Sequence, residues 1–458
     1  MVTAFLQHLE QIVWGPPLLI FLLASGVYLT VISKGVQVRY LFYSLKLAFS
    51  RHDDRAKGDI SHFEALMTAL AATIGIGSIS GVATAIATGG LGALFWLWLA
   101  AFLGMATKYS EAILAIKYRV VDEKNEMCGG PMYYLEKSLS KKHLGKALAA
   151  FFALAGAITA FGTGNMVQAN SVSTALFSNF NISPLISGSF LAVCTAVALF
   201  GGIKSIGKVS SYLVPVMAVF YIGGGLMVLA INYTLLPKAI AAIFSSAFTG
   251  EAATGGFLGA SVMLAIQYGV SRGIFSSEAG LGSAPIAAAA AKTDVPGRQA
   301  LISMSGVFIT SFIVCSITGL AIATTDVLGA IGPSGKVLNG SLMVIEAFNR
   351  TLPGSGVIIT ISLLLFAYST ILGWAYYGEK CVEYLFGVKS VFFYRIAFTL
   401  CLIPGSIVSL GIVWSFANVM NGLMAFPNLV GLFALSRVVQ EETQSFDLLV
   451  QNEEKSNL

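Results

Sequence analysis

Two stretches of this sequence combine groups that could bind a small zwitterion or a cation with residues that break helices. The first runs from Ala71 to Gly81 and contains Gly75, Gly77, a threonine and two serines within an apolar segment. Each glycine weakens a helix by roughly 1 kcal/mol relative to alanine, and a freed backbone group in lipid costs more unless something binds it. Unwinding around Gly75 and Gly77 would expose amide N–H groups that suit a carboxylate and carbonyls that suit a desolvated cation.

Two other interpretations of these glycines fit less well. Their spacing is G-x-G-x-x-x-G rather than the G-x-G-x-x-G of dinucleotide-binding folds, and no strand of a βαβ unit precedes it. Close packing of two helices through Gly77 and Gly81 would explain Gly81, but it does not require Gly75, Thr73 and Ser78. A break that exposes the backbone therefore remains the favoured interpretation.

The second stretch runs from Gln267 to Pro285 and is rich in glycine and hydroxyl groups. It also carries Arg272 and Glu278, each of which costs on the order of 3 kcal/mol inside a membrane and is therefore expected to be functional or paired. Their six-residue spacing is too long for one helical turn, so pairing needs a non-helical segment between them. We favour a gating or structural role for both over direct contact with a substrate. Phe275, between them, could cap a small pocket or simply pack.

Two further groups of polar residues lie in apolar segments. Ser369 and Thr370 are adjacent hydroxyls that could complete an oxygen cage for Na+ beside a broken helix, although such residues often bond only their own helix. Trp374 lies four residues after Thr370 and shares its face of the helix. Three amides between positions 165 and 170, one of them Gln168, suggest the wall of a polar cavity, whereas a single amide is ordinary glue between helices.

The elements that must position these groups are transmembrane helices. Hydrophobic residues make up 56% of the 458 residues and charged residues only 11%, against about 25% in soluble domains. The mean hydropathy is +0.81. Segments of roughly 20 apolar residues recur along the whole chain, so we expect an all-α integral membrane protein with about eleven spans. The predicted spans are 17–33, 62–88, 92–118, 147–178, 184–201, 210–231, 255–284, 298–324, 354–384, 391–411 and 412–436.

The two interrupted spans are the second and the seventh, so five spans separate the breaks. Without the first helix, ten spans form two sets of five that cross the membrane in opposite senses and each begin with a broken helix. This is the layout of an inverted-repeat transporter whose site lies where the broken helices meet. We therefore divide the chain into an N-terminal helix and basic interfacial loop (1–61), two five-helix repeats (62–254 and 255–436) and a cytosolic tail (437–458) whose polarity is typical of disorder.

Lys and Arg are distributed unevenly between the two sides of these spans. With the N-terminus outside and the C-terminus in the cytoplasm, nearly all of them fall on the inner side, and only Lys238, Lys336 and Arg350 lie outside. This asymmetry follows the positive-inside rule and predicts a multi-pass protein of the cell (inner) membrane.

Signatures of enzymes are missing from the sequence, including the Walker motif, H-E-x-x-H, G-x-S-x-G and an acidic metal cluster. The net charge of +5 does not imply nucleic acid, because in a membrane protein the side on which the charges lie matters more. Without an ATP site, any transport should be driven by an ion gradient. We expect no cofactor, and an oxygen cage of uncharged groups favours Na+ over a proton relay.

The sequence resembles the alanine or glycine:cation symporter family, also called sodium:alanine symporters. The resemblance covers most of the chain and rests on motifs in order, namely Ala65–Leu70, Thr73–Gly77, Gly81–Ile86, Gly129–Tyr134, Gly164–Asn170, Ser271–Ser276, Glu278–Pro285, Ser369–Trp374 and Tyr376–Lys380. It implies a LeuT-like fold and symport of a small neutral amino acid with Na+. The chain departs from the family's usual pattern where Ser78 and Ser277 replace asparagine, which puts substrate preference or cation affinity in question.

Residue by residue, the resemblance implies two adjoining sites. The substrate would contact the backbone at Gly75, Ile76 and Gly77, with Ser78 a weaker candidate, and the remaining contacts would come from Gln168, Phe275, Thr370 and Trp374. A cation would lie between the carbonyls of Ala71 and Ile74 and the hydroxyls of Ser369 and Thr370. The nearest alternative is a proton- or lithium-coupled transporter of another small amino acid. A channel or an intramembrane enzyme would be alternatives of other classes, but the sequence shows neither charged pore rings nor a reactive constellation.

Overall fold

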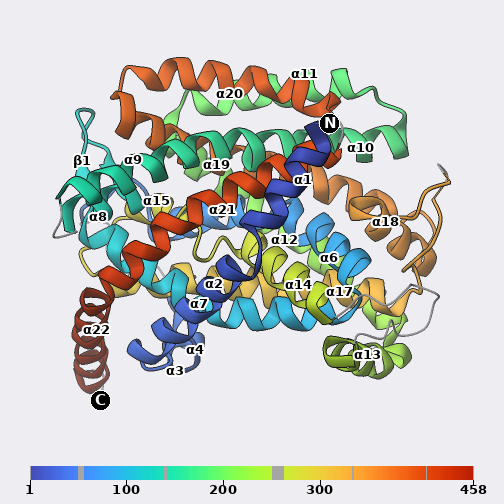
Figure 1. Cartoon of the computed structure of the whole chain (residues 1–458), viewed down its shortest axis with the longest axis horizontal. Helices are drawn as coiled ribbons and strands as arrows, with labels where there is room; N and C mark the ends of the chain where they lie inside the picture. The colour runs from blue at the N-terminus through green and yellow to red at the C-terminus, as the bar shows by residue number, and fades with distance from the viewer. Residues whose placement is uncertain are drawn as a thin grey trace.

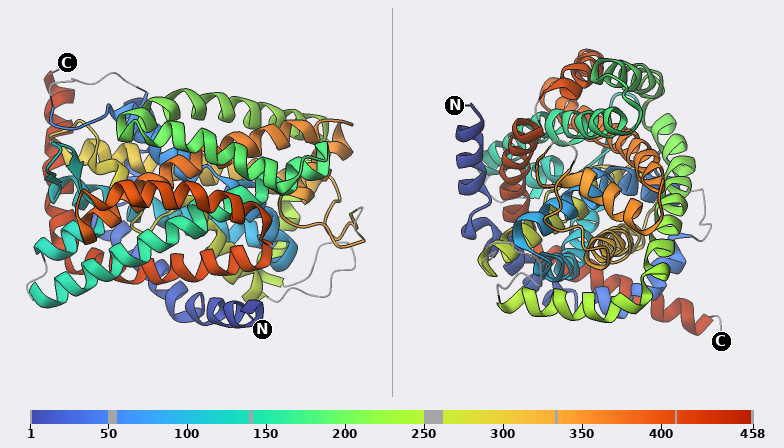
Figure 2. Two further views of the ribbon diagram at one scale, coloured as in Figure 1. Left: turned by 90° about the horizontal axis from the view of Figure 1, so that it is seen from above. Right: turned by 90° about the vertical axis from the view of Figure 1, so that its right-hand side faces the viewer.

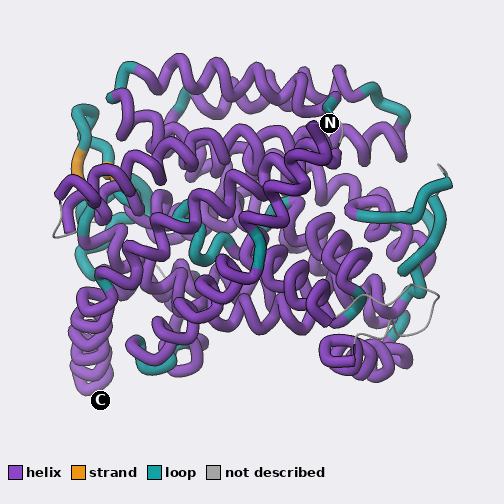
Figure 3. Tube along the Cα trace, viewed as in Figure 1, coloured by secondary structure: helices purple, strands orange, loops and turns teal. Residues whose placement is uncertain are grey.

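The chain folds into a bundle of long helices with one small hairpin (Figure 1). The computed structural model describes residues 2–49, 56–138, 142–249, 262–332, 335–408 and 410–456. Strand β1 (Val120–Val121) pairs antiparallel with β2 (Met127–Cys128), and we call the end of the bundle that carries them the hairpin end. The tube trace in Figure 3 shows that nearly all the remaining structure is helical.

Four helices precede the first predicted repeat. Pro16 begins the second of them, where a missing N–H is tolerated because the first N–H groups of a helix have no partner within it. The four are α1 (Val2–Val13), α2 (Pro16–Ile32), α3 (Val36–Arg39) and α4 (Leu41–Ala48).

The first predicted repeat begins with a broken helix. Ser61 and Glu64 form a capping box at the start of α5, which fixes where the helix begins. The axis then bends by 47° between residues 73 and 77, so the predicted first break is confirmed. The repeat comprises α5 (His62–Thr73), the π-helical η1 (Gly77–Gly81), α6 (Val82–Gly89), α7 (Gly92–Lys117), α8 (Pro131–Ser138), α9 (Lys142–Thr159), the π-helical η2 (Ala160–Met166), α10 (Val167–Phe180), α11 (Pro184–Leu199), α12 (Gly202–Ile231), η3 (Tyr233–Leu235) and α13 (Leu236–Thr249).

The second predicted repeat also begins with a broken helix, although its predicted start at 255 lies outside the described residues. The helix ends at Ser277, and residues 278–283 form the second break before a short helix follows. The elements are α14 (Val262–Ser277), α15 (Ala284–Ala289), α16 (Pro296–Val307), the π-helical η4 (Phe308–Val314), α17 (Cys315–Thr324), α18 (Gly340–Thr351), α19 (Gly356–Phe386), α20 (Ser390–Ile407) and α21 (Leu410–Ala434).

The second break is shorter than the glycine-rich sequence suggested. Helix α14 continues through Gly269, Arg272 and Gly273, so the non-helical segment expected between Arg272 and Glu278 is wrong. A Cβ atom at Gly269 would lie 2.4 Å from the carbonyl oxygen of Ala93, and one at Gly273 would lie 3.2 Å from that of Leu97. These glycines therefore allow α14 to pack closely on α7 rather than to unwind.

The predicted disorder of the C-terminal tail is also wrong for its described residues. They form α22 (Ser436–Ser456), a helix that projects at the hairpin end in Figure 1. Its acidic residues pair with basic residues of the bundle, because Asp447 lies 3.0 Å from Arg39, Glu442 pairs with Lys117 and Glu453 pairs with Arg298. The low apolar content of the tail reflects a helix held partly by charge.

Membrane-spanning helices account for most of the bundle. Among the described residues, eight helices are long and apolar enough to cross a bilayer, and the bent pair at the first break brings the number to nine. Two more predicted spans coincide with α11 and α14, of 16 residues each. The all-α class is confirmed, whereas eleven crossings remain a prediction. The views in Figure 2 show the long helices packed side by side around the broken ones.

Candidate functional site

The first break brings backbone oxygen and side-chain hydroxyls together inside the bundle. The carbonyl oxygen of Ala71, near the end of α5, accepts hydrogen bonds from Thr370 Oγ1 at 2.8 Å and from Ser369 Oγ at 3.3 Å. Both hydroxyls come from the middle of α19, and all three residues are at most 2% exposed. Three uncharged oxygens therefore converge on one point, which is the chemistry expected of a small desolvated cation site. The predicted contribution of the Ile74 carbonyl stays a prediction.

The glycines of the first break allow neighbouring helices to approach its backbone. A Cβ atom at Gly75 would lie 2.5 Å from Thr370 Oγ1, and one at Gly77 would lie 2.9 Å from Cδ1 of Phe275. Ile76, between them, is fully buried. The break is therefore enclosed by α19 on one side and by α14 on the other, and little room exists beside it for a large side chain.

Ser78 takes part in a hydroxyl network that joins the two broken helices. Its Oγ lies 2.8 Å from Oγ of Ser276, which also lies 3.3 Å from Sγ of Cys315. The backbone carbonyl of Ser78 accepts a hydrogen bond from Thr318 Oγ1 at 2.9 Å. The Thr318 hydroxyl in turn lies 2.6 Å from the hydroxyl of Tyr221. Ser78 therefore links the breaks, and sequence reasoning missed its partners because isolated serines and threonines in membrane helices most often bond their own helix.

Two of the three amides of η2 and α10 tie this segment to a neighbouring helix. Asn165 donates to the carbonyl of Phe398 at 2.5 Å, and Asn170 donates to that of Val408 at 2.5 Å, so both attach this segment to α20 and its end. Their side-chain oxygens have no hydrogen-bond partner among the described residues, so the predicted cavity wall stays a prediction. Gln168 donates to the carbonyl of Thr163 at 2.9 Å, and its buried Oε1 has no hydrogen-bond partner among the described residues. Gln168 thus keeps a free acceptor.

Trp374 is almost fully buried against η2. A Cβ atom at Gly164 would lie 2.0 Å from the Cβ atom of Trp374, so only glycine fits at this contact. The ring meets that of Tyr377 edge to face at 5.6 Å. Trp374 therefore fixes the distance between α19 and η2, one turn away from Thr370.

Arg272 lies about one turn before Phe275 on α14, on the side away from the second break. Its guanidinium stacks over Trp414 at 4.8 Å and over Phe275 at 5.7 Å, and Nη1 donates to Oδ1 of Asn418 at 3.0 Å. These residues adjoin a cavity of about 300 Å³ that is lined by Glu10, Gln11, Trp14, Gln267, Tyr268, Ser271, Arg272, Ser415 and Asn418. Arg272 thus lines this cavity, which we call the vestibule, and its gating or structural role stays a prediction.

Glu278 has different partners from Arg272, so the two do not form the ion pair considered from the sequence. Its Oε2 accepts a hydrogen bond from Ser283 at 2.8 Å, and its backbone has a positive φ of 56°. Two residues of α7, Lys108 and Glu111, bond the backbone of the same break. Charged residues within an apolar span are a signal of function, and both could have been found from the sequence on that ground.

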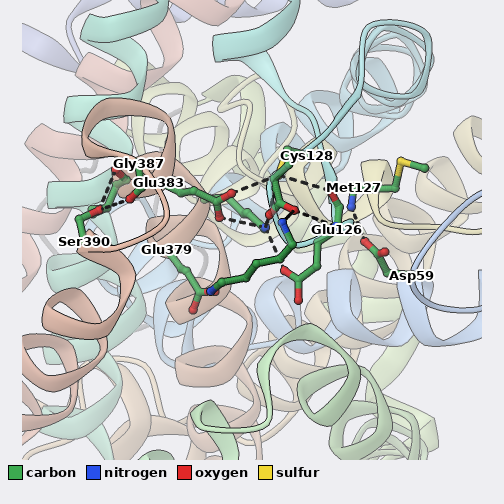
Figure 4. A network of polar contacts seen from close by, with 12 residues as sticks. Asp59, Glu126, Met127, Cys128, Glu379, Glu383, Gly387 and Ser390 are labelled. Carbon is green, nitrogen blue, oxygen red and sulfur yellow. Dashed lines mark hydrogen bonds and ion pairs between the residues drawn. The ribbon is translucent and has the colours of Figure 1, made fainter.

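A polar network closes the hairpin end of the bundle (Figure 4). The ammonium group of Lys380, ten residues beyond Thr370 on α19, lies 3.4 Å from Asp122, 3.2 Å from Glu126 and 3.0 Å from Glu383. The thiol of Cys128 lies 3.3 Å from the same nitrogen, and burial raises the pKa of this thiol to about 12. The hairpin is therefore tied to the helix that carries the candidate cation site.

A group of Asp122, Cys128 and Glu383 in this network has ligand atoms close enough to hold a metal ion. The ammonium group of Lys380 contacts all three side chains. A metal would have to displace this cation, so we interpret the group as an ion-pair network.

Comparisons with known proteins bear on the family and the fold of this chain. The model of the sodium:alanine symporter family matches residues 1–458. The sodium/alanine symporter AgcS of Methanococcus maripaludis is 54% identical over 455 residues, which cover 99% of each chain. The structure of MhsT in complex with L-phenylalanine matches with a TM-score of 0.60 at 15% identity, over 86% of this chain and 99% of that one. A Na+-coupled sialic acid symporter matches with a TM-score of 0.54 at 14% identity, over 92% and 87% of the two chains. The structural matches confirm the LeuT-like fold.

Proposed function

The chain belongs to the sodium:alanine symporter family, and from this premise we propose that it couples uptake of alanine or glycine to Na+ influx by alternating access. Na+-coupled amino-acid symport, as opposed to an enzymatic reaction, follows from the family itself. The preference for the smallest amino acids and the residues that carry it are proposals argued from this chain.

The observation that carries the proposal is the convergence of Ser369 and Thr370 on the carbonyl of Ala71 at the first break. The Thr370 proton is directed to that carbonyl, and the Ser369 proton is shared between it and the closer carbonyl of Phe366 at 2.9 Å. If they turned away, Na+ could take their place and be held by the same three oxygens, with Ile74 as a further proposed ligand. Because no formal charge is required, the ion can leave again once the site is hydrated.

The substrate is proposed to lie against the backbone from Gly75 to Gly77, where the start of the outer half-helix favours a carboxylate. Thr370 touches the position of Gly75, and Phe275 touches that of Gly77. Gln168, with its free acceptor, and Trp374 complete the proposed set, and Ser78 acts through its link to Ser276 rather than through substrate. The tight approach of these side chains supports a small amino acid.

Two features at opposite ends support alternating access. At one end, the vestibule lined by Arg272 adjoins Phe275. At the other, the hairpin end is closed by the Lys380 network and by Arg119. The guanidinium of Arg119 donates to the carbonyls of Ala289, the last residue of α15, and of Ala291. We assign the hairpin end to the cytoplasm, because this orientation satisfies the positive-inside rule and places the N-terminus outside. The chain is then a multi-pass protein of the inner membrane whose partners are Na+, an amino acid and lipid.

Uptake of labelled alanine and glycine into proteoliposomes tests the proposal. Accumulation should require an inward Na+ gradient and should collapse when the gradient is dissipated. A proton gradient or Li+ replacing Na+ without loss would support the alternative coupling, and accumulation indifferent to every cation gradient would contradict ion-driven symport.

A further inference from the structure

A second group of buried charges lies at the second break, beside Trp374 of the proposed substrate site and distinct from the proposed Na+ ligands. Lys108 and Glu111 come from α7, and Glu278 is the first residue after α14. Their side chains are 3%, 0% and 1% exposed. Ionisable groups this deep in a membrane bundle require partners, and the partners of these three are unequal.

One oxygen of Glu111 is surrounded by donors, while its buried Oε2 has no hydrogen-bond partner among the described residues. Its Oε1 accepts N–H groups of Gly280 and Gly282 at 3.1 Å each and the side-chain amide of Asn428 at 2.6 Å. Three N–H donors on one oxygen stabilise an ionised carboxylate. The positive φ values of Gly280 and Gly282, 87° and 80°, turn their N–H groups to the same side and form an anion-binding loop.

Glu278 has fewer donors than Glu111 to stabilise a negative charge. Ser283 donates to its Oε2 and the side chain of Trp374 also interacts with the carboxylate, whereas the two N–H groups of the loop and the amide of Asn428 are all directed to Glu111. It follows directly on the C-terminus of α14, where the helix dipole is negative and disfavours an anion. Lys108 donates to the carbonyl of Ser277 at 2.8 Å, at the same helix end.

The charges of the cluster do not balance. Lys108 supplies one positive charge for two carboxylates, so one negative charge is left in a buried position unless another cation joins it. We propose that Glu278 carries a bound proton in this conformation, so that the second break is a proton-binding site distinct from the Na+ site. The proton comes from water at the hairpin end, binds Oε1 of the carboxylate, and returns to water when that end opens; no electrons are transferred.

A proton fits this place better than Na+. A sodium ion needs several oxygen ligands, whereas the carbonyl of Ser277 is already bonded to Lys108 and Oε2 of Glu278 to Ser283. The ammonium group of Lys108 would also repel a metal ion. A proton needs only one free oxygen. Oε1 of Glu278 and Oε2 of Glu111 both lack a hydrogen-bond partner among the described residues, and Glu278 is the carboxylate that the loop N–H groups and Asn428 do not reach.

Other titratable groups around the cluster do not supply the missing charge. Tyr377 of α19 faces Glu278, and Tyr134 of α8 donates to Oδ1 of Asn428 beside Glu111. Both are neutral phenols. Arg272, on α14 itself, is directed to Asn418. Within the part of the chain that the structure describes, Lys108 is therefore the cation nearest to the two acids.

The site has a path to the hairpin end when that end opens. A Cβ atom at Gly282 would lie 2.6 Å from Pro131 of α8, and one at Gly130 would lie 2.8 Å from Ile286 of α15. The second break therefore packs directly on the segment that follows the β1–β2 hairpin. Release of the Lys380 network would loosen this contact and admit water. Proton exchange is therefore expected on the hairpin side.

Infrared spectroscopy of the full-length protein in lipid tests the proposal without transport. The carbonyl stretch of a protonated carboxylic acid should be present at neutral pH, shift in D2O and disappear in Glu278→Gln. Glu379→Gln serves as the matched control, because Glu379 is equally buried but paired with Arg395 at 2.7 Å, and it should leave the band intact. Absence of the band in the wild-type protein, or its persistence in Glu278→Gln, would overturn the proposal.

Two milder variants decide which acid holds the proton. Ser283→Ala removes the donor to Glu278 and should shift the band, whereas Asn428→Ala removes a donor to Glu111 and should leave it in place. The opposite pattern would place the proton on Glu111 and overturn the assignment. Loss of the band on adding Na+, but not on adding choline, would show that Na+ occupies the site instead.

Transport gives an independent readout that rests on the proposed function. With a fixed Na+ gradient, wild-type uptake should change with the pH on the hairpin side by up to about tenfold per unit. Glu278→Gln, which mimics the protonated acid, should keep Na+-driven uptake but lose this dependence. An unchanged pH profile would contradict proton exchange, whereas uptake independent of Na+ in both proteins would contradict the proposed function and leave the infrared result standing.

Discussion

Replacing Thr370 by valine removes one oxygen from the proposed Na+ site and leaves the shape of the side chain nearly unchanged. The hydroxyl lies 2.8 Å from the Ala71 carbonyl, and the remaining hydroxyl, that of Ser369, lies at 3.3 Å. An oxygen that contacts a charged partner contributes about 1.5–3 kcal/mol, and about 1.4 kcal/mol corresponds to tenfold in affinity. We therefore expect the half-saturating Na+ concentration to rise by roughly 10- to 150-fold in Thr370→Val.

The assay is alanine binding to the purified protein, titrated with Na+ at constant ionic strength. Alanine affinity at a fixed, subsaturating Na+ concentration should fall as well, because binding of the two ligands is linked. Thr370→Ser, which keeps the oxygen, should behave nearly as the wild type. Thr159→Val is the matched control, since the hydroxyl of this equally buried threonine bonds only the carbonyl of Ala155 in its own helix. A folded Thr370→Val protein with wild-type Na+ dependence would refute the site.

Two further predictions concern the walls of the site and its inner closure. Gly77→Ala should weaken alanine binding because its Cβ would meet Phe275 at 2.9 Å, whereas Gly81→Ala, whose nearest contact is Arg272 at 3.8 Å, should be neutral in the same binding assay. With Cys194 and Cys401 replaced by serine, maleimide should modify Cys128 on the order of 10³-fold more slowly than a free thiol, because burial raises its pKa to about 12. Lys380→Met removes the ammonium group that lowers the pKa of this thiol, which by itself slows labelling, and it leaves three carboxylates unneutralised, which should open the hairpin end. Faster labelling in this variant would therefore have to come from opening, and an unchanged or slower rate would argue against the network as a closure.

The sequence predicted the first break well because its signals are local. Gly75 and Gly77 lie in an apolar span where few other reasons for two glycines exist, and the structure bends there. At the second break the same signal was ambiguous. Gly269 and Gly273 lie within a continuous helix and serve its contact with α7, while the bend comes later, at Glu278. A glycine alone does not distinguish a broken helix from a close contact.

Residues whose role depends on a distant partner were predicted least well. Asn165 and Asn170 bond the backbone of α20 and its end, more than two hundred positions away, and no local pattern separates such glue from a cavity wall. Ser78 was considered a substrate contact, but its partner Ser276 belongs to the other broken helix. In each case the residue type indicated a polar role, and only the packing of the helices determined which one.

The two breaks are stabilised in different ways, and this difference explains how one can bind an exchangeable ion while the other stays formed. At the first, the carbonyl of Ala71 is satisfied by neutral hydroxyls, which Na+ can replace without separating charges. At the second, the ammonium of Lys108 and the carboxylate of Glu111 bond the backbone permanently from α7. Removing either would leave a buried charge unpaired, at a cost of several kcal/mol. These two charged side chains therefore hold the backbone of the second break, and the variable charges are confined to Na+ at the first break and the proposed proton on Glu278.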